Sequence, residues 1–137
     1  MTVSKLNQIL LIDDDEAVNF INKIILTKSA CATEILAIQN ARIALDILEQ
    51  NVHANPERPE LIFLDINMPG MDGWEFLDNY AKLPQNYIEN IKLIMLTTSV
   101  NPEHKKRAEQ YKEVAGFRVK PLSMQMASEI MESYFQK

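Results

Sequence analysis

The sequence contains little of what builds disulfides, thiolate metal centres or membrane spans. Its single cysteine, Cys31, excludes an internal disulfide and a cysteine-based zinc site. No long apolar run follows Met1, so we expect no signal peptide, and no run elsewhere is long enough to span a bilayer. Basic residues are in the minority, since 14 Lys and Arg against 19 Asp and Glu give a net charge of −5. This balance argues against a surface for nucleic acid or anionic membrane, and we expect a cytoplasmic protein.

Length and composition are those of one globular domain. The 137 residues are 47% hydrophobic and 24% charged, which is typical of globular and not of disordered chains. A chain of this length buries most of its apolar surface without disulfides or metal ions. No repeat, low-complexity tract or linker divides it, so we expect residues 1–137 to form a single domain.

Short apolar runs alternate with amphipathic segments along the chain. Five runs predict strands, at residues 9–12, 34–38, 61–64, 91–96 and 116–119. The helix after the first strand is expected to bury Val18, Ile21 and Ile25, because these residues are spaced by three and four. Two other helices repeat this spacing, at Ala41, Ala44, Leu45 and Leu48 and at Ala127, Ile130, Met131 and Tyr134.

Two further helices and one loop complete the pattern. Helices are predicted over residues 74–83, before Pro84, and over 102–114, while residues 51–60 predict a loop because they hold two prolines and no periodicity. Strands alternating with helices indicate an α/β fold, and uninterrupted apolar strands indicate burial on both faces. We therefore expect a doubly wound sandwich of five strands and five helices, with a parallel five-stranded sheet, right-handed crossovers and helices on both sides.

Polar residues fall where the predicted strands end. Asp13 and Asp14 end the first strand, Asp65 the third, Thr97 the fourth and Lys120 the fifth. The carboxyl ends of parallel strands open onto one edge, where such folds bind ligands, so these side chains are expected to converge. Clustered carboxylates favour a bound cation, and hard oxygen ligands that leave room for water and phosphate suit Mg²⁺. No histidine ends a strand, which argues against zinc.

A metal ion, a carboxylate, a hydroxyl and a lysine in one crevice suit phosphoryl transfer. A carboxylate attacks a phosphoryl group and holds it as an acyl phosphate. The metal ion and the lysine then neutralise charge on the phosphoryl oxygens, while the hydroxyl donates a hydrogen bond. The strand ends therefore predict a phosphoryl-accepting site.

Four segments carry a resemblance to a known family. LLIDDDE spans residues 10–16, LIFLDINMPGMDG spans 61–73, IMLTT spans 94–98 and FRVKP spans 117–121. In this order and spacing they resemble the response-regulator receiver domain of two-component signalling, of the CheY-like type, over essentially the whole chain. The resemblance implies the flavodoxin-like strand order 2-1-3-4-5 and a cis bond before the proline of FRVKP.

The resemblance implies a role for each residue of the switch. Asp65 would be the phosphoacceptor, Thr97 would contact the phosphoryl group, and Lys120 would pair with it. Phe117 would be the aromatic switch residue that moves inward when Thr97 is drawn towards the phosphate. Asn67 and Ser99, each two residues beyond a site residue, would lie where the family tunes dephosphorylation.

The resemblance also implies a ligand set for Mg²⁺. Asp13, Asp14 and Asp65 would hold the ion together with the main-chain carbonyl of Asn67, with Asp14 favoured as the direct ligand of the acidic pair. Because three acids stand in a row at residues 13–15, the register of that pair is open by one position. Asp15 is also well placed to cap the following helix.

The same resemblance implies partners and a route for the signal. A sensor histidine kinase or a phosphotransfer protein would supply the phosphoryl group, and the domain would catalyse its own phosphorylation and dephosphorylation without being a turnover enzyme. Only one predicted helix follows Lys120, so no output domain is expected. The signal would leave by protein–protein contact with an unknown target, through the fourth helix, fifth strand and fifth helix, and a phosphorylation-dependent homodimer stays open.

Two rival functions stay open from the sequence. A phosphatase of the haloacid-dehalogenase type also uses an Asp at a strand end, but it needs a second Asp where this sequence has Asn67. A degenerate receiver would be a phosphate-independent binding module, which the intact set of site residues disfavours. Outside the strand ends, the basic run at residues 104–107 is interpreted as a solvated helix face, and Trp74 and Cys31 as packing residues.

Overall fold

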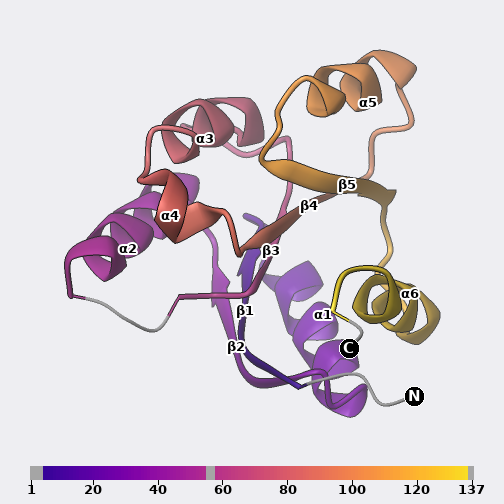
Figure 1. Ribbon diagram of the computed structural model, residues 1–137. Helices are drawn as coiled ribbons and strands as arrows, with labels where there is room; N and C mark the ends of the chain where they lie inside the picture. The colour runs from indigo at the N-terminus through magenta and orange to yellow at the C-terminus, as the bar shows by residue number, and fades with distance from the viewer. Residues whose placement is uncertain (1–4, 55–57, 136–137) are drawn as a thin grey trace.

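Five parallel strands form one sheet between two layers of helices (Figure 1). The computed structural model describes residues 5–54 and 58–135. The strands are β1 (Leu6–Ile12), β2 (Ala32–Ile38), β3 (Leu61–Leu64), β4 (Lys92–Thr97) and β5 (Val114–Val119). They are hydrogen-bonded in the order β2-β1-β3-β4-β5, and all four pairs are parallel. The predicted α/β class, parallel sheet and strand order are confirmed.

The described residues form six helices, one more than predicted. They are α1 (Glu16–Lys28), α2 (Ala41–Ala54), α3 (Gly73–Tyr80), α4 (Gln85–Ile88), α5 (Pro102–Glu109) and α6 (Met124–Tyr134). The extra helix is α4, a single turn that begins after Pro84 and is anchored by the buried side chains of Tyr87 and Ile88. None of the helices in the described ranges is long and apolar enough to cross a membrane.

Several predicted boundaries were wrong. Residues 51–54 belong to α2 and not to the predicted loop, because the periodic apolar pattern continues from Leu48 to Val52, which packs against the core. Of the predicted loop, residues 55–57 lie outside the described residues. Helices α3 and α5 both end earlier than predicted, and β5 begins at Val114, with a register irregularity opposite residues 93 and 94 of β4.

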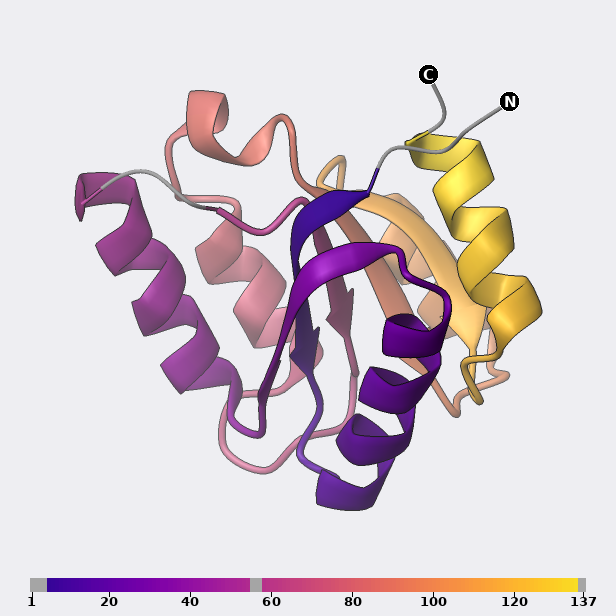
Figure 2. The ribbon, with the colours of Figure 1, turned by 90° about the horizontal axis from the view of Figure 1, so that it is seen from below.

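Alternation along the strands divides the core between the two faces of the sheet. Leu10 and Ile12 of β1 face one layer, and Ile9 and Leu11 face the other, as expected for side chains with a period of two. Helices α2, α3, α4 and α5 cover the first face, and α1 and α6 cover the second, as Figures 1 and 2 show. Burial on both faces explains why residues 9–12 of β1 and all of β3 are apolar without interruption.

The faces predicted for α2 and α6 are confirmed, and the face predicted for α1 is partly wrong, because Val18 and Ile25 are half-buried but Ile21 is not. In α2, residues Ala41, Ala44, Leu45 and Leu48 are all buried, and in α6 so are Ala127, Ile130 and Met131, with Tyr134 partly buried. In α1, by contrast, Ile21 is 54% exposed, while the buried positions are Asn19, Asn22 and Leu26. Asn19 turns inward because its side-chain amide donates a hydrogen bond to the Asp13 carbonyl, at 2.8 Å.

Candidate functional site

The carboxyl edge of the sheet gathers the three acids that the sequence places there. Asp13 and Asp14 follow β1 and Asp65 follows β3, and neighbouring parallel strands end at the same edge (Figure 2). One carboxylate oxygen from each of the three residues lies within 4.8 Å of the others. Asp13 and Asp65 are buried, whereas Asp14 is exposed. The predicted convergence of the acids is therefore present, with an open side at Asp14.

Lys120 follows β5, the strand at one edge of the sheet, and brings a positive charge to these acids. Its Nζ lies 2.5 Å from Oδ2 of Asp13 and 3.5 Å from Oδ1 of Asp65. The backbone holds the lysine in place, because Lys120 N–H donates to the Thr97 carbonyl at 2.8 Å. The Lys120–Pro121 peptide bond is cis, as the resemblance implied.

The surroundings of Asp65 raise the pKa of its carboxyl group. Burial is the largest cause, and the Lys120 ammonium opposes it; the nearby Asp13 carboxylate raises the pKa further, while the Ile66 N–H lowers it. A carboxylate that is buried beside another acid is costly to ionise unless a cation compensates. Asp65 therefore lies where both a metal ion and the lysine would favour its charged, nucleophilic form.

Thr97 lies on β4, the strand next to β3 and Asp65, and Phe117 lies on β5, one strand further out. Thr97 is fully buried at the end of β4, and its Oγ1 accepts a hydrogen bond from Ser99 N–H at 3.3 Å. Phe117 lies opposite Met95 in the pairing of β4 with β5 and is partly buried against the core. The aromatic side chain therefore borders solvent and core at once, which is the position that an inward-moving residue needs.

Of the three consecutive acids at residues 13–15, Asp15 caps a helix, while Asp13 and Asp14 belong to the acidic cluster. Asp15 caps α1, since its Oδ1 accepts hydrogen bonds from Ala17 N–H and Val18 N–H at 2.9 and 3.1 Å. Asp13 Oδ1 accepts the Asp15 N–H at 2.9 Å, which fixes the turn between β1 and α1. The capping role expected for Asp15 is confirmed, and among the described residues the acidic cluster consists of Asp13, Asp14 and Asp65.

Two buried asparagines support the cluster and were missed by sequence reasoning. Asn19 and Asn22 line a small cavity of about 10 Å³ together with Asp13 and Asp65. The available signal was their spacing with Leu26 at three and four positions, which places all three on one helix face. Periodicity that counts only apolar residues overlooks such a face.

Glycine lets α3 approach the backbone of Asp65. A Cβ on Gly73 would lie 2.5 Å from the Asp65 carbonyl oxygen and 2.9 Å from Ile66 Cα. The Gly73 N–H donates to the Ile66 carbonyl at 2.8 Å, so the close approach ties the beginning of α3 to the strand end. Gly70 has a positive φ of 77°, whereas Gly73 allows this close packing.

Comparisons with known proteins agree on one family. The profile of the response regulator receiver domain matches residues 9–132. Response regulator Rcp1 of Synechocystis is 32% identical over 96 residues, which cover 69% of this chain and slightly less than two thirds, 64%, of Rcp1. A two-component response regulator from Cytophaga hutchinsonii superposes with a TM-score of 0.87 at 30% identity, covering 96% of this chain and 98% of that one. The chain belongs to the response regulator receiver family.

A further solved structure shows a relative in its phosphorylated form. The phosphorylated cyanobacterial phytochrome response regulator RcpA superposes with a TM-score of 0.74 at 26% identity, over 93% of this chain and 89% of RcpA. Membership of the family places this receiver domain in phosphorylation-based signalling. Receiver domains interact in general with histidine kinases or phosphotransfer proteins and with downstream targets.

The donors at the carboxyl edge of this receiver domain fit Mg²⁺. Receiver domains generally bind this ion in an acidic pocket, and here three carboxylates approach within 4.8 Å. Carboxylate oxygens are the ligands that Mg²⁺ prefers, and the ion keeps several waters when few protein ligands are present. Asn67 is exposed, and its carbonyl is used by no hydrogen bond within the described ranges, so that oxygen is available as a ligand.

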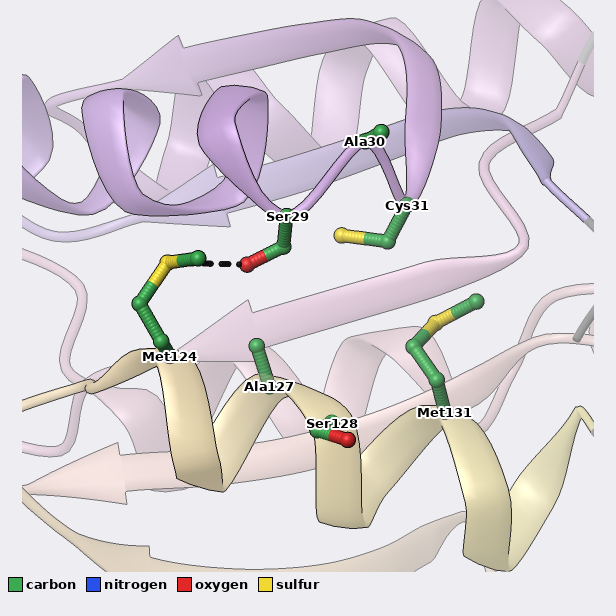
Figure 3. A pocket seen from close by; sticks show the side chains of 7 residues that line it. All are labelled: Ser29, Ala30, Cys31, Met124, Ala127, Ser128 and Met131. Carbon is green, nitrogen blue, oxygen red and sulfur yellow. Dashed lines mark hydrogen bonds between the residues drawn. The ribbon is translucent and has the colours of Figure 1, made fainter.

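A separate pocket of about 290 Å³ involves none of these residues. It lies between the end of α1 and α6, lined by Ser29, Ala30, Cys31, Met124, Ala127, Ser128 and Met131 (Figure 3). Burial raises the pKa of the Cys31 thiol, and a raised pKa keeps a cysteine unreactive. Cys31 is 6% exposed, which confirms its interpretation as a packing residue of this receiver domain.

Proposed function

We propose that this receiver accepts a phosphoryl group on Asp65, in a Mg²⁺-dependent reaction, and signals through the resulting change in shape. The observation that carries the proposal is the position of Lys120, whose Nζ lies 3.5 Å from Asp65 Oδ1 and also pairs with Asp13. A lysine that contacts both carboxylates is placed to neutralise the negative charge that builds up on a phosphoryl group at Asp65. The raised pKa of Asp65 supports the same assignment, because perturbed carboxylates gather at functional sites.

The phosphoryl transfer exchanges one bond to phosphorus for another. A carboxylate oxygen of Asp65 forms a bond to phosphorus as the phosphorus–nitrogen bond of a phosphohistidine breaks, and the departing imidazole keeps the electron pair of that bond. Mg²⁺, held by Asp13, Asp14, Asp65 and the Asn67 carbonyl, would neutralise the phosphoryl oxygens. Hydrolysis returns the site to its initial state when water attacks phosphorus and inorganic phosphate leaves.

The same geometry supports a switch built from Thr97 and Phe117. Thr97 Oγ1 accepts the Ser99 N–H, which leaves its own hydroxyl hydrogen available to a phosphoryl oxygen. Movement of Thr97 towards the phosphate would vacate space for the half-buried Phe117 on the adjoining strand. Thr97 and Phe117 would thus have two discrete arrangements, and a phosphoryl group on Asp65 would determine which of them is populated. The pair would then be a bistable element.

The phosphodonor that we propose is a histidine kinase or a phosphotransfer protein, and the output is a contact with another protein. The family as a whole interacts with such partners, and RcpA, a structural relative, is known in phosphorylated form. The output surface would be α5, β5 and α6, because β5 carries Phe117 and a short loop joins Thr97 to α5.

The test is intact-protein mass spectrometry after incubation with acetyl phosphate, with and without Mg²⁺. We expect one phosphoryl group to be gained only when Mg²⁺ is present, and none in Asp65→Asn. Asp15→Asn is a matched control, since it removes a neighbouring charge but keeps an oxygen that caps α1, and it should be labelled like the wild type. Absence of labelling in a folded wild-type protein would instead favour a phosphate-independent binding module.

A further inference from the structure

Ser99, the residue of the loop between β4 and α5 that contacts Thr97, also forms hydrogen bonds that connect it to α5. Ser99 donates its N–H to Thr97 Oγ1 at 3.3 Å. The Ser99 hydroxyl lies 2.6 Å from His104 Nδ1 and accepts the Asn101 N–H at 3.2 Å. Both the main chain and the side chain of Ser99 are therefore held, one by the switch threonine and the other by the first turn of α5.

The ring of His104 is itself fixed by α3. Its plane meets the ring of Trp74 edge to face, at 63° and 6.1 Å between centroids. Trp74 is buried, stacks on Tyr111 and carries the Arg107 guanidinium 4.4 Å from its ring centroid. The basic run at residues 104–107 is thus more than the solvated face expected from the sequence, because two of its four side chains pack on Trp74.

We propose that His104 is a positioning residue that holds Thr97, through Ser99, in the arrangement of the unphosphorylated protein. The proposal rests on phosphorylation of Asp65 as the signal, and it adds a residue of α5 to the switch. Since Ser99 N–H binds Thr97 Oγ1, any displacement of Thr97 must move or break that contact. The bond to His104 opposes this movement because it anchors Ser99 to a helix packed against α3.

Whether loss of the Ser99–His104 hydrogen bond speeds or slows phosphorylation depends on which of the two states that bond stabilises. A bond that holds the resting arrangement lowers the population of the active one, and its removal raises that population. One hydrogen bond shifts such an equilibrium by about fivefold. Loss of the bond between Ser99 and His104 Nδ1 is therefore expected to speed phosphorylation by acetyl phosphate roughly threefold to tenfold.

Three variants separate the hydrogen bond from the packing of the ring. His104→Phe keeps a ring against Trp74 but removes Nδ1, and Ser99→Ala removes the hydroxyl. His104→Asn places a side-chain amide, which can accept or donate a hydrogen bond, near the position of Nδ1 and should return the rate towards that of the wild type. Lys105→Gln, which changes an exposed neighbour in the same turn, is the matched control.

The measurements are the rate of labelling and the methyl NMR signal of Thr97 in the unphosphorylated protein. We expect His104→Phe and Ser99→Ala to accelerate labelling and to give Thr97 an averaged rotamer. The double variant should be no faster than either single one, because both remove the same bond. Additive effects of the two changes, or a His104→Phe variant with wild-type rate and rotamer, would overturn the proposal.

The two readouts also separate this proposal from the proposed function. If the wild type is not labelled but His104→Phe alters the Thr97 rotamer, the positioning role stands and phosphorylation at Asp65 is wrong. If labelling proceeds and neither readout responds to His104→Phe, phosphorylation stands and the positioning role is wrong. The fluorescence of Trp74, the only tryptophan, checks that the contact between α3 and α5 is intact in each variant.

Discussion

Lys120 and Asp13 are 107 positions apart in the sequence, and their side chains form an ion pair at 2.5 Å across the carboxyl edge of the sheet. The pair is largely buried, with 13% and 8% of the two side chains exposed. It exists because the order β2-β1-β3-β4-β5 lets the end of β5 reach across β4 and β3 towards β1. The lysine supplies positive charge that the clustered carboxylates need in order to stay ionised together.

Replacement of Lys120 should therefore lower the free energy of unfolding as well as the rate of phosphorylation. Lys120→Met leaves two buried carboxylates without their cation, and removal of one partner of a buried pair destabilises by about 3–5 kcal/mol. Because Mg²⁺ bound at the proposed site would supply charge to the same carboxylates, the loss should shrink when the ion is added. Urea unfolding with and without Mg²⁺ measures this; Lys82→Met, an exposed site, should stay within about 0.5 kcal/mol of wild type.

The pH dependence should reveal the raised pKa of Asp65. Only the ionised carboxylate is a nucleophile. At Mg²⁺ concentrations below saturation, the labelling rate should therefore begin to fall, as the pH is lowered, at a higher pH than it would for an ordinary aspartate. A rate that stays constant down to the usual titration range of aspartate would contradict this expectation.

Stability should depend on pH through the same carboxyl group. Its pKa is higher in the folded than in the unfolded chain, so the folded state binds the proton more tightly. The resulting stabilisation is full below the unfolded pKa and is lost as pH rises through the folded pKa. Asp65→Asn should therefore be more stable than the wild type near neutral pH, with the difference vanishing in acid. Urea unfolding across pH, with Asp15→Asn as reference, measures it.

Addition of Mg²⁺ should stabilise the wild type through Asp14. A ligand that binds only the folded state stabilises by about 1.4 kcal/mol when present at ten times its dissociation constant. Asp14 is exposed beside two buried acids, so Asp14→Asn should weaken this stabilisation without disturbing the core. Thermal unfolding in the presence and absence of a chelator provides the measurement. Glu109→Gln, at the end of α5, should respond to Mg²⁺ like the wild type; an Asp14→Asn variant that does so too would remove Asp14 from the ligand set.

Strand pattern alone was sufficient to predict the sheet and the convergence of polar strand ends. The carboxyl ends of parallel strands open onto one edge of a sheet, so Asp13, Asp65 and Lys120 were expected to lie together. The assignment of chemical roles went further than this convergence and depended on the resemblance to receiver domains. Geometry alone shows a carboxylate cluster with a lysine.

What escaped prediction depends on specific side-chain contacts, which apolar periodicity does not encode. The buried face of α1 includes two asparagines, and Asn19 turns inward because it donates a hydrogen bond to the Asp13 carbonyl. The turn α4 is too short for any helical period and is held by the burial of Tyr87 and Ile88. The contact between His104 and Ser99 depends on the path of a loop, which residue spacing does not specify.

A pair of glycine substitutions should separate strain in a turn from displacement of Asp65. Gly73→Ala would place a methyl group 2.5 Å from the Asp65 carbonyl oxygen, so the start of α3 and the strand end must move apart, at about 1–3 kcal/mol. Gly70→Ala meets nothing within 4 Å and carries only the strain of φ = 77°, about 1–2 kcal/mol. The two variants should thus lose similar stability in urea, yet only Gly73→Ala should slow labelling by acetyl phosphate. Equal labelling rates in the two variants would show that the position of Asp65 tolerates this displacement.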